Sequence, residues 1–234
     1  MLSIAIATMR RWDFLKDSIP VYLARPEVKE VILCDETGED CAAALASPFG
    51  THPKLRLVTN EKRLGIYQNK RKALSLAKGE WVAVLDSDNF FSDEWFDTLL
   101  RCDFSNKKQI YGSADCKFIN NITNEITYPL KAFSGLTLSR ENWNTMFQKE
   151  RWTWILNDGN WVVPKDTIYC LPDFPEKNLH AADAIYMLRL FIKYGYKITF
   201  VPDLEYLHIV HSGSSWLETD TQSTHVINTF NWKI

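Results

Sequence analysis

Short apolar segments alternate with amphipathic segments over the first hundred residues. The apolar runs are four to six residues long and rich in β-branched residues, which is typical of buried strands. The segments between them repeat apolar residues every three or four positions, as helices do, and Gly79 follows one of them as a stop signal. The pattern predicts strands at 3–8, 30–34, 55–59 and 81–85, and helices at 12–24 with a break near Pro20, 39–47, 65–77 and 93–101.

Strands that alternate with helices indicate an α/β fold with a mostly parallel sheet and helices on both faces. In such sheets, ligands bind beyond the carboxyl ends of the strands. The second half of the chain is more mixed. Its segments at 109–114, 115–118 and 132–138 predict a partly antiparallel extension of the same sheet, followed by a helix at 183–194 and a strand at 197–201. With no repeat or linker, we expect one domain over 1–234, and no element is assigned to 212–234.

Composition excludes several classes of protein. Hydrophobic residues make up 46% and charged residues 24% of the chain, and the net charge of −2 comes without the basic stripe of a nucleic-acid-binding protein. The five cysteines are scattered and lack a Cys-x-x-Cys spacing, which argues against a disulfide framework and favours a reducing compartment. No apolar run is long enough for a transmembrane helix. We expect a cytoplasmic protein, with peripheral attachment to a membrane left open.

Two carboxylates follow the strand expected at 81–85. Asp86 and Asp88 are separated only by Ser87, so both lie at the binding edge of the sheet. Hard divalent cations such as Mg²⁺ and Mn²⁺ prefer carboxylate and phosphate oxygens, and this pair is a candidate site for one of them. A cap for the next helix is the alternative, and the motif by itself does not separate the two.

Two further features accompany this pair. The strand at 30–34 also ends in a carboxylate, Asp35, which can accept hydrogen bonds from a nucleobase or ribose but can equally cap the following helix. Gly65 opens the helix at 65–77 and permits close approach of the backbone to a ligand. Lys70 follows in that helix; it can contact a base or a diphosphate, or belong to a solvated helix face.

In this order and spacing, these features resemble the family 2 glycosyltransferases of the GT-A fold. That family has Pro-Thr-x-Asn-Arg after its first strand, where this chain has Ala-Thr-Met-Arg-Arg ending at Arg11, without the Pro and Asn. Lys70 stands where the family has an Arg. The likeness spans about 3–211. The other matching segments are Asp35-Glu36-Thr37-Gly38, Ala77-Lys78-Gly79-Glu80-Trp81, Gly159-Asn160-Trp161, Asp183 with Arg189 and Gly195, and Val201-Pro202 before His208.

The resemblance implies a Rossmann-like GT-A domain with a nucleotide-binding half at 1–101, a sugar and acceptor half at 102–211 and a tail at 212–234. It implies transfer of a sugar from a nucleotide-diphosphate donor, most often a UDP-sugar, to a glycan, lipid or protein hydroxyl. Asp183 would be the general base of an inverting reaction, at the rim of the site. Its alternative role is a helix cap. Ala182 replaces the family's usual Glu.

The resemblance also implies the remaining site residues. Mn²⁺ or Mg²⁺ would bind Asp88, with Asp86 as a second ligand or a ribose contact, and His208 or His211 would complete the metal shell, His208 being preferred. The donor would be held by Thr8, Arg11, Asp35, Gly65, Lys70, Asp86, Gly159 and Trp161.

Tryptophans are a further source of candidate contacts, because indole rings stack on the C–H faces of sugars. Four of them, Trp143, Trp152, Trp154 and Trp161, lie close together in the sequence. Core packing is the more common fate of any one. Trp161 is the preferred sugar contact because it adjoins Gly159 and Asn160.

Two other functions compete with sugar transfer. A sugar-phosphate nucleotidyltransferase also combines a Rossmann-like sheet with a divalent cation, but it usually has a glycine-rich loop after the first strand, where this chain has Met9-Arg10-Arg11-Trp12. A non-catalytic nucleotide-sugar-binding domain is the other alternative; Asp86, Asp88 and Asp183 argue against it only if they converge in space.

Overall fold

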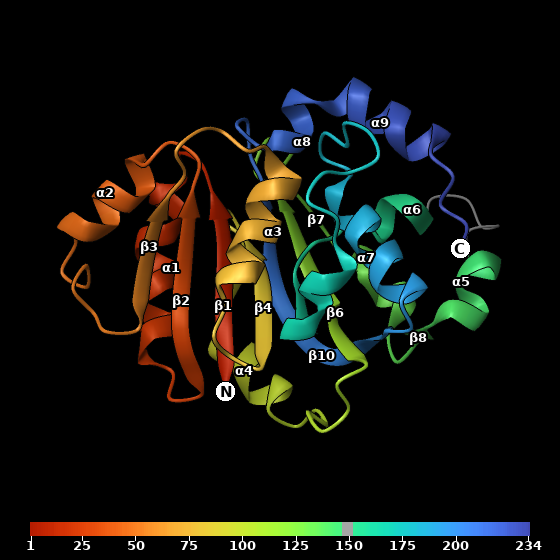
Figure 1. Ribbon diagram of the computed structural model, residues 1–234, viewed down its shortest axis with the longest axis horizontal. Coiled ribbons are helices and arrows are strands. Elements are labelled where there is room, and N and C mark those ends of the chain that lie inside the picture. The colour runs from red at the N-terminus through yellow and green to blue at the C-terminus, as the bar shows by residue number, and fades with distance from the viewer. Residues whose placement is uncertain (147–151) are drawn as a thin grey trace.

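The computed structural model describes residues 1–146 and 152–234, which form an α/β fold around one sheet (Figure 1). The strands are β1 (Leu2–Thr8), β2 (Val28–Asp35), β3 (Leu55–Thr59), β4 (Trp81–Asp86), β5 (Phe90–Phe91), β6 (Gln109–Asn120), β7 (Glu125–Thr127), β8 (Thr137–Leu138), β9 (Trp161–Pro164) and β10 (Lys197–Val210). The α-helices are α1 (Trp12–Ala24), α2 (Glu39–Ala46), α3 (Ile66–Leu76), α4 (Asp93–Leu99), α5 (Arg140–Met146), α6 (Trp152–Ile155), α7 (Asp183–Lys193), α8 (Ser215–Glu218) and α9 (Asp220–Thr229), with 3₁₀ turns η1 (Pro129–Phe133) and η2 (Lys165–Cys170).

The sheet is mixed, and its long ladders are parallel. Its strand order is β3-β2-β1-β4-β9-β6-β10-β5, with β7 beside β6 and β8 beside β10. The ladders β2–β3, β1–β2, β1–β4 and β6–β10 are parallel. The short strands β5, β7, β8 and β9 run antiparallel to their neighbours. The expected mostly parallel sheet with an antiparallel extension is therefore confirmed.

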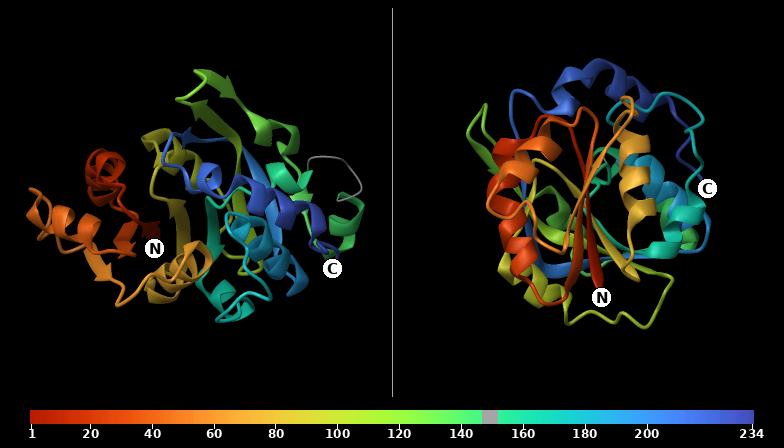
Figure 2. Two further views of the ribbon diagram at one scale, coloured as in Figure 1. Left: turned by 90° about the horizontal axis from the view of Figure 1, so that it is seen from above. Right: turned by 60° about the vertical axis from the view of Figure 1, so that its left-hand side comes forward.

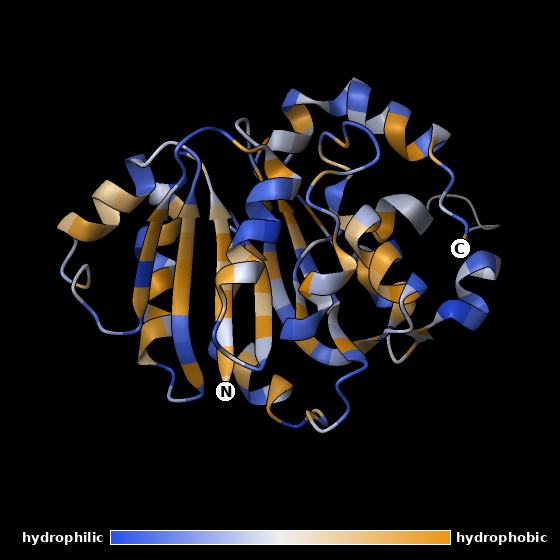
Figure 3. Cartoon of the chain, in the orientation of Figure 1, coloured by the Kyte–Doolittle hydropathy of each residue, from blue (hydrophilic) through white to orange (hydrophobic). Residues whose placement is uncertain are grey.

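The apolar runs of the first strands form the core. Parallel strands covered on both faces bury side chains in both directions, which is why β1, β2 and β4 have continuous apolar runs instead of alternation (Figure 3). Helices α3 and α7 lie on one face of the sheet, and α1 and α4 on the other (Figures 1 and 2). Among the described residues, no helix is long and apolar enough to cross a membrane.

Several expected boundaries were wrong. Helix α1 continues through Pro20 without a break. The two segments expected at 109–114 and 115–118 are one strand, β6. Of the segment expected at 132–138, only β8 is a strand. Strand β10 does not stop at Val201 but runs to Val210, with a change of register where Asp203 takes a positive φ of 59°. The 212–234 tail contains α8 and α9.

The strand register brings the candidate residues to one edge. Thr8 at the end of β1 pairs with Asp35 at the end of β2, and Ala7 pairs with Asp86 at the end of β4. Helices α8 and α9 lie beyond this end of the sheet at the upper right of Figure 1, above α3, α6 and α7. The end of the sheet that binds ligands in parallel folds is therefore partly roofed by the tail.

Candidate active site

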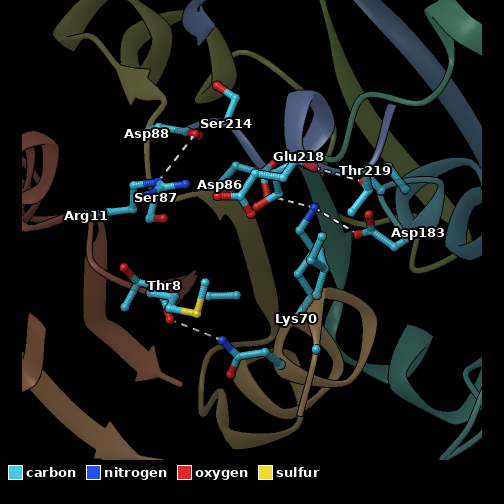
Figure 4. Close-up of a pocket in the computed structure, with 18 of the residues that line it drawn as sticks. Thr8, Arg11, Lys70, Asp86, Ser87, Asp88, Asp183, Ser214, Glu218 and Thr219 are labelled. Carbon is cyan, nitrogen blue, oxygen red and sulfur yellow. Dashed lines mark hydrogen bonds and ion pairs between the residues drawn. The ribbon is translucent and has the colours of Figure 1, made fainter. Parts of the chain in front are cut away.

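A cavity of about 490 Å³ lies at the carboxyl ends of the strands (Figure 4). Its walls come from segments far apart in the sequence: the loop after β1, the start of α3, the turn after β4, the end of β10, and α8. Among the predicted residues, its lining includes Thr8, Arg11, Gly65, Lys70, Asp86, Asp88, Asp183 and His208. The predicted convergence of Asp86, Asp88 and Asp183 therefore occurs in one cavity.

The turn after β4 points Asp88 toward two cationic or basic groups. The N–H of Asn89 donates to the carbonyl of Asp86 and closes the turn. Asp88 Oδ2 then lies 3.2 Å from His211 Nε2 and 3.9 Å from Arg11 Nε. Burial by itself raises the pKa of Asp88, but the hydrogen bond from His211 and the electrostatic effects of His208 and Arg11 outweigh it and hold this pKa below its usual value. Asp88 is therefore a carboxylate with an imidazole at its side.

The two histidines of β10 and its following loop differ in their contacts. His211 contacts Asp88, whereas the ring of His208 stacks on Phe118 with 3.7 Å between centroids and has its Nδ1 3.5 Å from Asn89 Nδ2. The expected preference for His208 as the partner of Asp88 is therefore not supported by this geometry. His211 lies in the loop after β10. It reaches Asp88 because β10 extends nine residues beyond Val201 and places His211 just past the strand end.

Lys70 lies between two carboxylates and is buried. Its Nζ is 2.7 Å from Asp86 Oδ1 and 3.0 Å from Asp183 Oδ2 (Figure 4). Burial by itself lowers the pKa of Lys70, but the two carboxylates raise it above the usual value. A methyl group on Gly159 would lie 2.8 Å from this Nζ, so the glycine leaves room for the ammonium. Lys70 is thus paired with two carboxylates of the cavity, and its expected contact with a nucleobase stays a prediction.

Asp183 begins α7 and lies inside the cavity wall. Its side chain is about 4% exposed, so the expectation of a position at the rim of the site was wrong. Burial raises the pKa of Asp183, the Lys70 ammonium opposes that shift, and the Asp86 carboxylate adds to it. The N-cap residue of α7 is Ala182, so Asp183 is the first residue of the helix and not its N-cap. The capping alternative is therefore not supported by the geometry.

The carboxylate of Asp35 is turned away from the cavity. It is fully buried and accepts hydrogen bonds from the N–H groups of Thr37 and Cys41, at 3.0 Å each. Asp35 therefore stabilises the start of α2, which is the alternative role that the sequence left open. Its side chain does not line the cavity. The next residue, Glu36, does line it and accepts a hydrogen bond from Leu64 N at 2.6 Å. Of this acidic pair, only Glu36 lines the cavity, and the donor contact expected for Asp35 stays a prediction.

Thr8 and Arg11 line the cavity but are tied to their neighbours. Thr8 Oγ1 donates to Asp40 at 2.5 Å, and the same carboxylate accepts from Arg11 N. The Arg11 guanidinium donates to the carbonyl of Gly213. Gly65 has a positive φ of 83°, which glycine adopts without strain, and its backbone lines the cavity as expected.

The tryptophans separate into core and cavity residues. Trp161 is 3% exposed between β4 and β6 and does not line the cavity, so the preferred sugar contact was wrong. Trp143 is also buried, and its Nε1 donates to the carbonyl of Trp232. Trp154, 37% exposed, lines the cavity. It is the member of the group whose position suits a ligand contact.

The C-terminal tail supplies cavity residues that sequence reasoning missed. Ser214, Ser215, Glu218 and Thr219 line the cavity from the loop before α8 and from α8 itself. Ser214 Oγ accepts from His211 N at 2.9 Å, so the tail also fixes the histidine beside Asp88. The polar composition of 212–234 gave no periodic signal. Arg63, at the start of the same cavity wall as Gly65, was missed as well.

The donor atoms beside Asp88 fit a divalent cation. Metal–oxygen and metal–nitrogen distances of about 2.0–2.2 Å place neighbouring donors roughly 3 Å apart. The 3.2 Å between Asp88 Oδ2 and His211 Nε2 matches that spacing. In the arrangement seen here, Gly213 N–H donates to His211 Nδ1, so Nε2 carries the ring proton and donates to Asp88. A cation bound to Nε2 would take the place of that proton. Asp86 is paired with Lys70 in the same cavity.

Comparison with known proteins places this geometry in a family. The mouse polypeptide N-acetylgalactosaminyltransferase 5 is 26% identical over 162 residues, which are 67% of this chain and only 16% of that protein. Among solved structures, S. aureus TarS 1–349 in complex with UDP-GlcNAc has a TM-score of 0.68 at 16% identity, over 97% of this chain and 65% of that one. The mannosyltransferase PcManGT from Pyrobaculum calidifontis, in complex with GDP-Man and Mn²⁺, has a TM-score of 0.64 at 16% identity, over 96% and 61%.

These structural likenesses show the same fold, and they confirm the GT-A-like architecture. This chain spans less than two thirds of the length of each of these relatives. The family itself is shown by sequence: the model of glycosyl transferase family 2 matches residues 3–160, which is more than half of the chain. The chain therefore belongs to glycosyl transferase family 2.

Proposed function

We propose that this chain is a metal-dependent glycosyltransferase that moves a sugar from a nucleotide-diphosphate donor, such as a UDP-sugar, to an acceptor hydroxyl with inversion. One observation carries the proposal. A single cavity is lined both by Asp88, whose carboxylate lies beside the His211 imidazole at the spacing of metal ligands, and by Asp183, a buried carboxylate held by the Lys70 ammonium. Sugar transfer needs both groups: one to stabilise the negative charge of the departing diphosphate, and one to take the proton of the acceptor hydroxyl.

The Asp88 end of the cavity is suited to the donor diphosphate. When bound there by Asp88 and His211, Mn²⁺ or Mg²⁺ would stabilise the negative charge that develops on the departing diphosphate. Arg11 lies on the same side and adds a fixed positive charge that does not depend on the cation. The mannosyltransferase neighbour was solved with Mn²⁺, which supports this choice of ion for the present chain.

The nucleoside would lie between the β1 end and α3. Glu36 and Arg63 give a carboxylate and a guanidinium on this wall, and the backbone of Gly65 allows close approach. We assign to Glu36 the donor contact that the sequence suggested for Asp35. Residues 1–101 would thus hold the nucleotide, and residues 102–211 together with the tail would hold the sugars.

Asp183 would act as the general base. An acceptor hydroxyl becomes a good nucleophile when its proton is removed as it attacks, and a positioned carboxylate contributes typically about 10²–10⁴-fold. Lys70 keeps this carboxylate oriented from inside the wall. Direct attack by that hydroxyl, opposite to the leaving diphosphate, inverts the anomeric centre.

The test is donor turnover with a panel of nucleotide sugars, with Mn²⁺ and with EDTA. We expect release of a nucleoside diphosphate that stops with EDTA and returns with excess Mn²⁺. NMR of the glycoside gives its anomeric configuration, which should be inverted. Formation of a nucleoside triphosphate from donor and pyrophosphate would favour a nucleotidyltransferase. Donor binding without turnover, with every acceptor class tried, would favour a binding domain.

A further inference from the structure

A second group of side chains of the types that ligate metals lies beside the cavity. It consists of the Cys116 thiol on β6, the Asp158 carboxylate just before β9 and the His208 imidazole on β10. One donor atom from each lies within 4.8 Å of the other two. Asp88 and His211, the pair assigned to the donor cation, are not members of this group.

The strand register explains why these residues meet. In the parallel β6–β10 ladder, Cys116 is paired with Tyr206, and Phe118 is paired with His208. Alternate residues of a strand face the same side, so Cys116 and His208 project from one face of the sheet. β9 is the other neighbour of β6, and the turn that leads into it brings Asp158 to the same place.

The charge of Asp158 is not balanced by a cation. This carboxylate is 6% exposed and accepts hydrogen bonds only from neutral donors: the Asn160 N–H at 3.1 Å, Asn160 Nδ2 at 2.8 Å, and the Tyr206 hydroxyl. Among the residues that the structure describes, no side chain forms an ion pair with it. A buried carboxylate without a paired charge is costly, and a bound cation would remove that cost.

The other two donors are available to such a cation. The Cys116 thiol is fully buried, and this burial raises its pKa, so the thiol keeps its proton unless a positive charge is placed beside it. The Nδ1 atom of His208 lies 3.5 Å from Asn89 Nδ2, which is at the limit of a hydrogen bond. The Cys116 thiol also has a hydrogen bond with the Tyr206 hydroxyl, which it would give up on binding a cation.

We propose that Cys116, Asp158 and His208 form a binding site for a thiophilic divalent cation, namely Zn²⁺ or Co²⁺. One sulfur, one imidazole nitrogen and one carboxylate oxygen is a donor set that suits Zn²⁺, whereas Mg²⁺ prefers oxygen alone. Zinc–ligand distances of about 2.0–2.3 Å require these donors to approach by on the order of 1 Å. Binding converts the thiol to a thiolate, and its proton leaves to solvent.

This site gives the two histidines separate tasks. His211 serves the Asp88 position, and His208 serves the thiophilic site while its other side lines the cavity. A cation held by His208 would fix the ring against Phe118 at the cavity wall. The inference does not depend on sugar transfer, because it concerns binding of the metal alone.

The experiment is a Co²⁺ titration of the reduced full chain, followed by the thiolate-to-cobalt charge-transfer absorption. We expect the band in the wild type and in Asp88→Asn, and its disappearance when one equivalent of Zn²⁺ is added. Cys116→Ser and His208→Ala should lack the band. Cys102→Ser is the matched control, since Cys102 is the one half-exposed thiol of the five and lies outside the group.

Circular dichroism establishes that each variant is folded before titration. No charge-transfer band in the folded wild type would overturn the proposal, and so would a band that survives in Cys116→Ser. If Cys116→Ser does not fold, Asp158→Asn and the wild type are compared for bound zinc after dialysis. One equivalent retained by the wild type and lost in Asp158→Asn supports the site; equal zinc in both refutes it.

Discussion

His211 Nε2 lies 3.2 Å from Asp88 Oδ2, although the two residues are 123 positions apart in the sequence. The contact depends on the tail, because Ser214 Oγ and Gly213 N–H hold the backbone and the ring of His211 in place. Asp88 therefore has a partner that the turn after β4 could not supply by itself.

Replacing His211 by Ala should weaken metal binding at Asp88. We expect the Mn²⁺ concentration for half-maximal activity to rise about tenfold or more, because one of two protein ligands is lost. His208→Ala is the matched control and should leave this concentration nearly unchanged. Mn²⁺ binding followed by electron paramagnetic resonance checks the assignment without turnover. Equal losses in both variants would show that the histidines act together at Asp88.

Asp183→Asn should remove catalysis and keep donor binding. The amide preserves the shape of the side chain but cannot accept a proton, so we expect transfer to fall at least about a hundredfold. The dissociation constant of the donor, measured by calorimetry, should stay within about twofold, since Asp183 would contact the acceptor. Normal transfer by a folded Asp183→Asn protein would exclude this residue as the base.

The raised pKa of Asp183 predicts the pH dependence of kcat. The base works as a carboxylate, so activity is lost as the pH falls through its pKa and the group takes up a proton. Because burial raises that pKa, the acidic limb of the kcat profile should lie above the value of about 3.9 that is usual for Asp. The profile is measured with saturating donor and Mn²⁺. An acidic limb at or below the ordinary Asp value would contradict the burial argument.

Gly159→Ala should disturb the row formed by Asp86, Lys70 and Asp183. The added methyl would lie 2.8 Å from Lys70 Nζ, so the ammonium must move while both carboxylates remain. We expect kcat to fall about tenfold or more, since small displacements of a catalytic group are costly. Donor affinity should change little. A variant with unchanged kcat and stability would show that the position of Lys70 has no bearing on Asp183.

Trp154 and Trp161 should respond in opposite ways to replacement by Ala. Trp154 lines the cavity, so its loss should raise the KM of a substrate and leave the melting temperature nearly unchanged. Trp161 is buried, so its loss should cost about 3–5 kcal/mol of folding free energy. Thermal melts and steady-state kinetics on the two variants give the comparison. A large fall in stability for Trp154→Ala would assign that ring to the core.

The sequence was sufficient for most of the sheet and insufficient for side-chain direction. A strand that is covered on both faces of the sheet has apolar residues at successive positions, so an apolar run locates it in the sequence. The ends of β1, β2 and β4 were found in this way. A carboxylate at a strand end, however, can turn toward a cavity or toward backbone N–H groups. Asp35 turns toward backbone N–H groups, whereas Asp88 turns toward the cavity. The local sequences of the two residues do not distinguish these outcomes.

The remaining errors have the same origin in tertiary contacts. Strand β10 continues past Val201 because β6 offers a partner as far as Asn120, which no local propensity reveals. Lys70 is an ordinary helix residue in the sequence, and only the approach of α7 gives it a second carboxylate. The tail has little periodicity, so its place over the cavity follows from contacts such as that of Trp143 with Trp232.

The hydrogen bond from Arg11 to Gly213 joins residues 202 positions apart. Contacts of such long range form late in folding, because a large loop has to close before they add any stability. A chain still emerging from the ribosome can therefore pair β1 with β2 long before residue 213 has been made. The contact between Asp88 and His211 cannot form until residues 211–214 have been made. A cation bound by Asp88 and His211 would therefore stabilise the chain by mass action only after this long-range contact has closed.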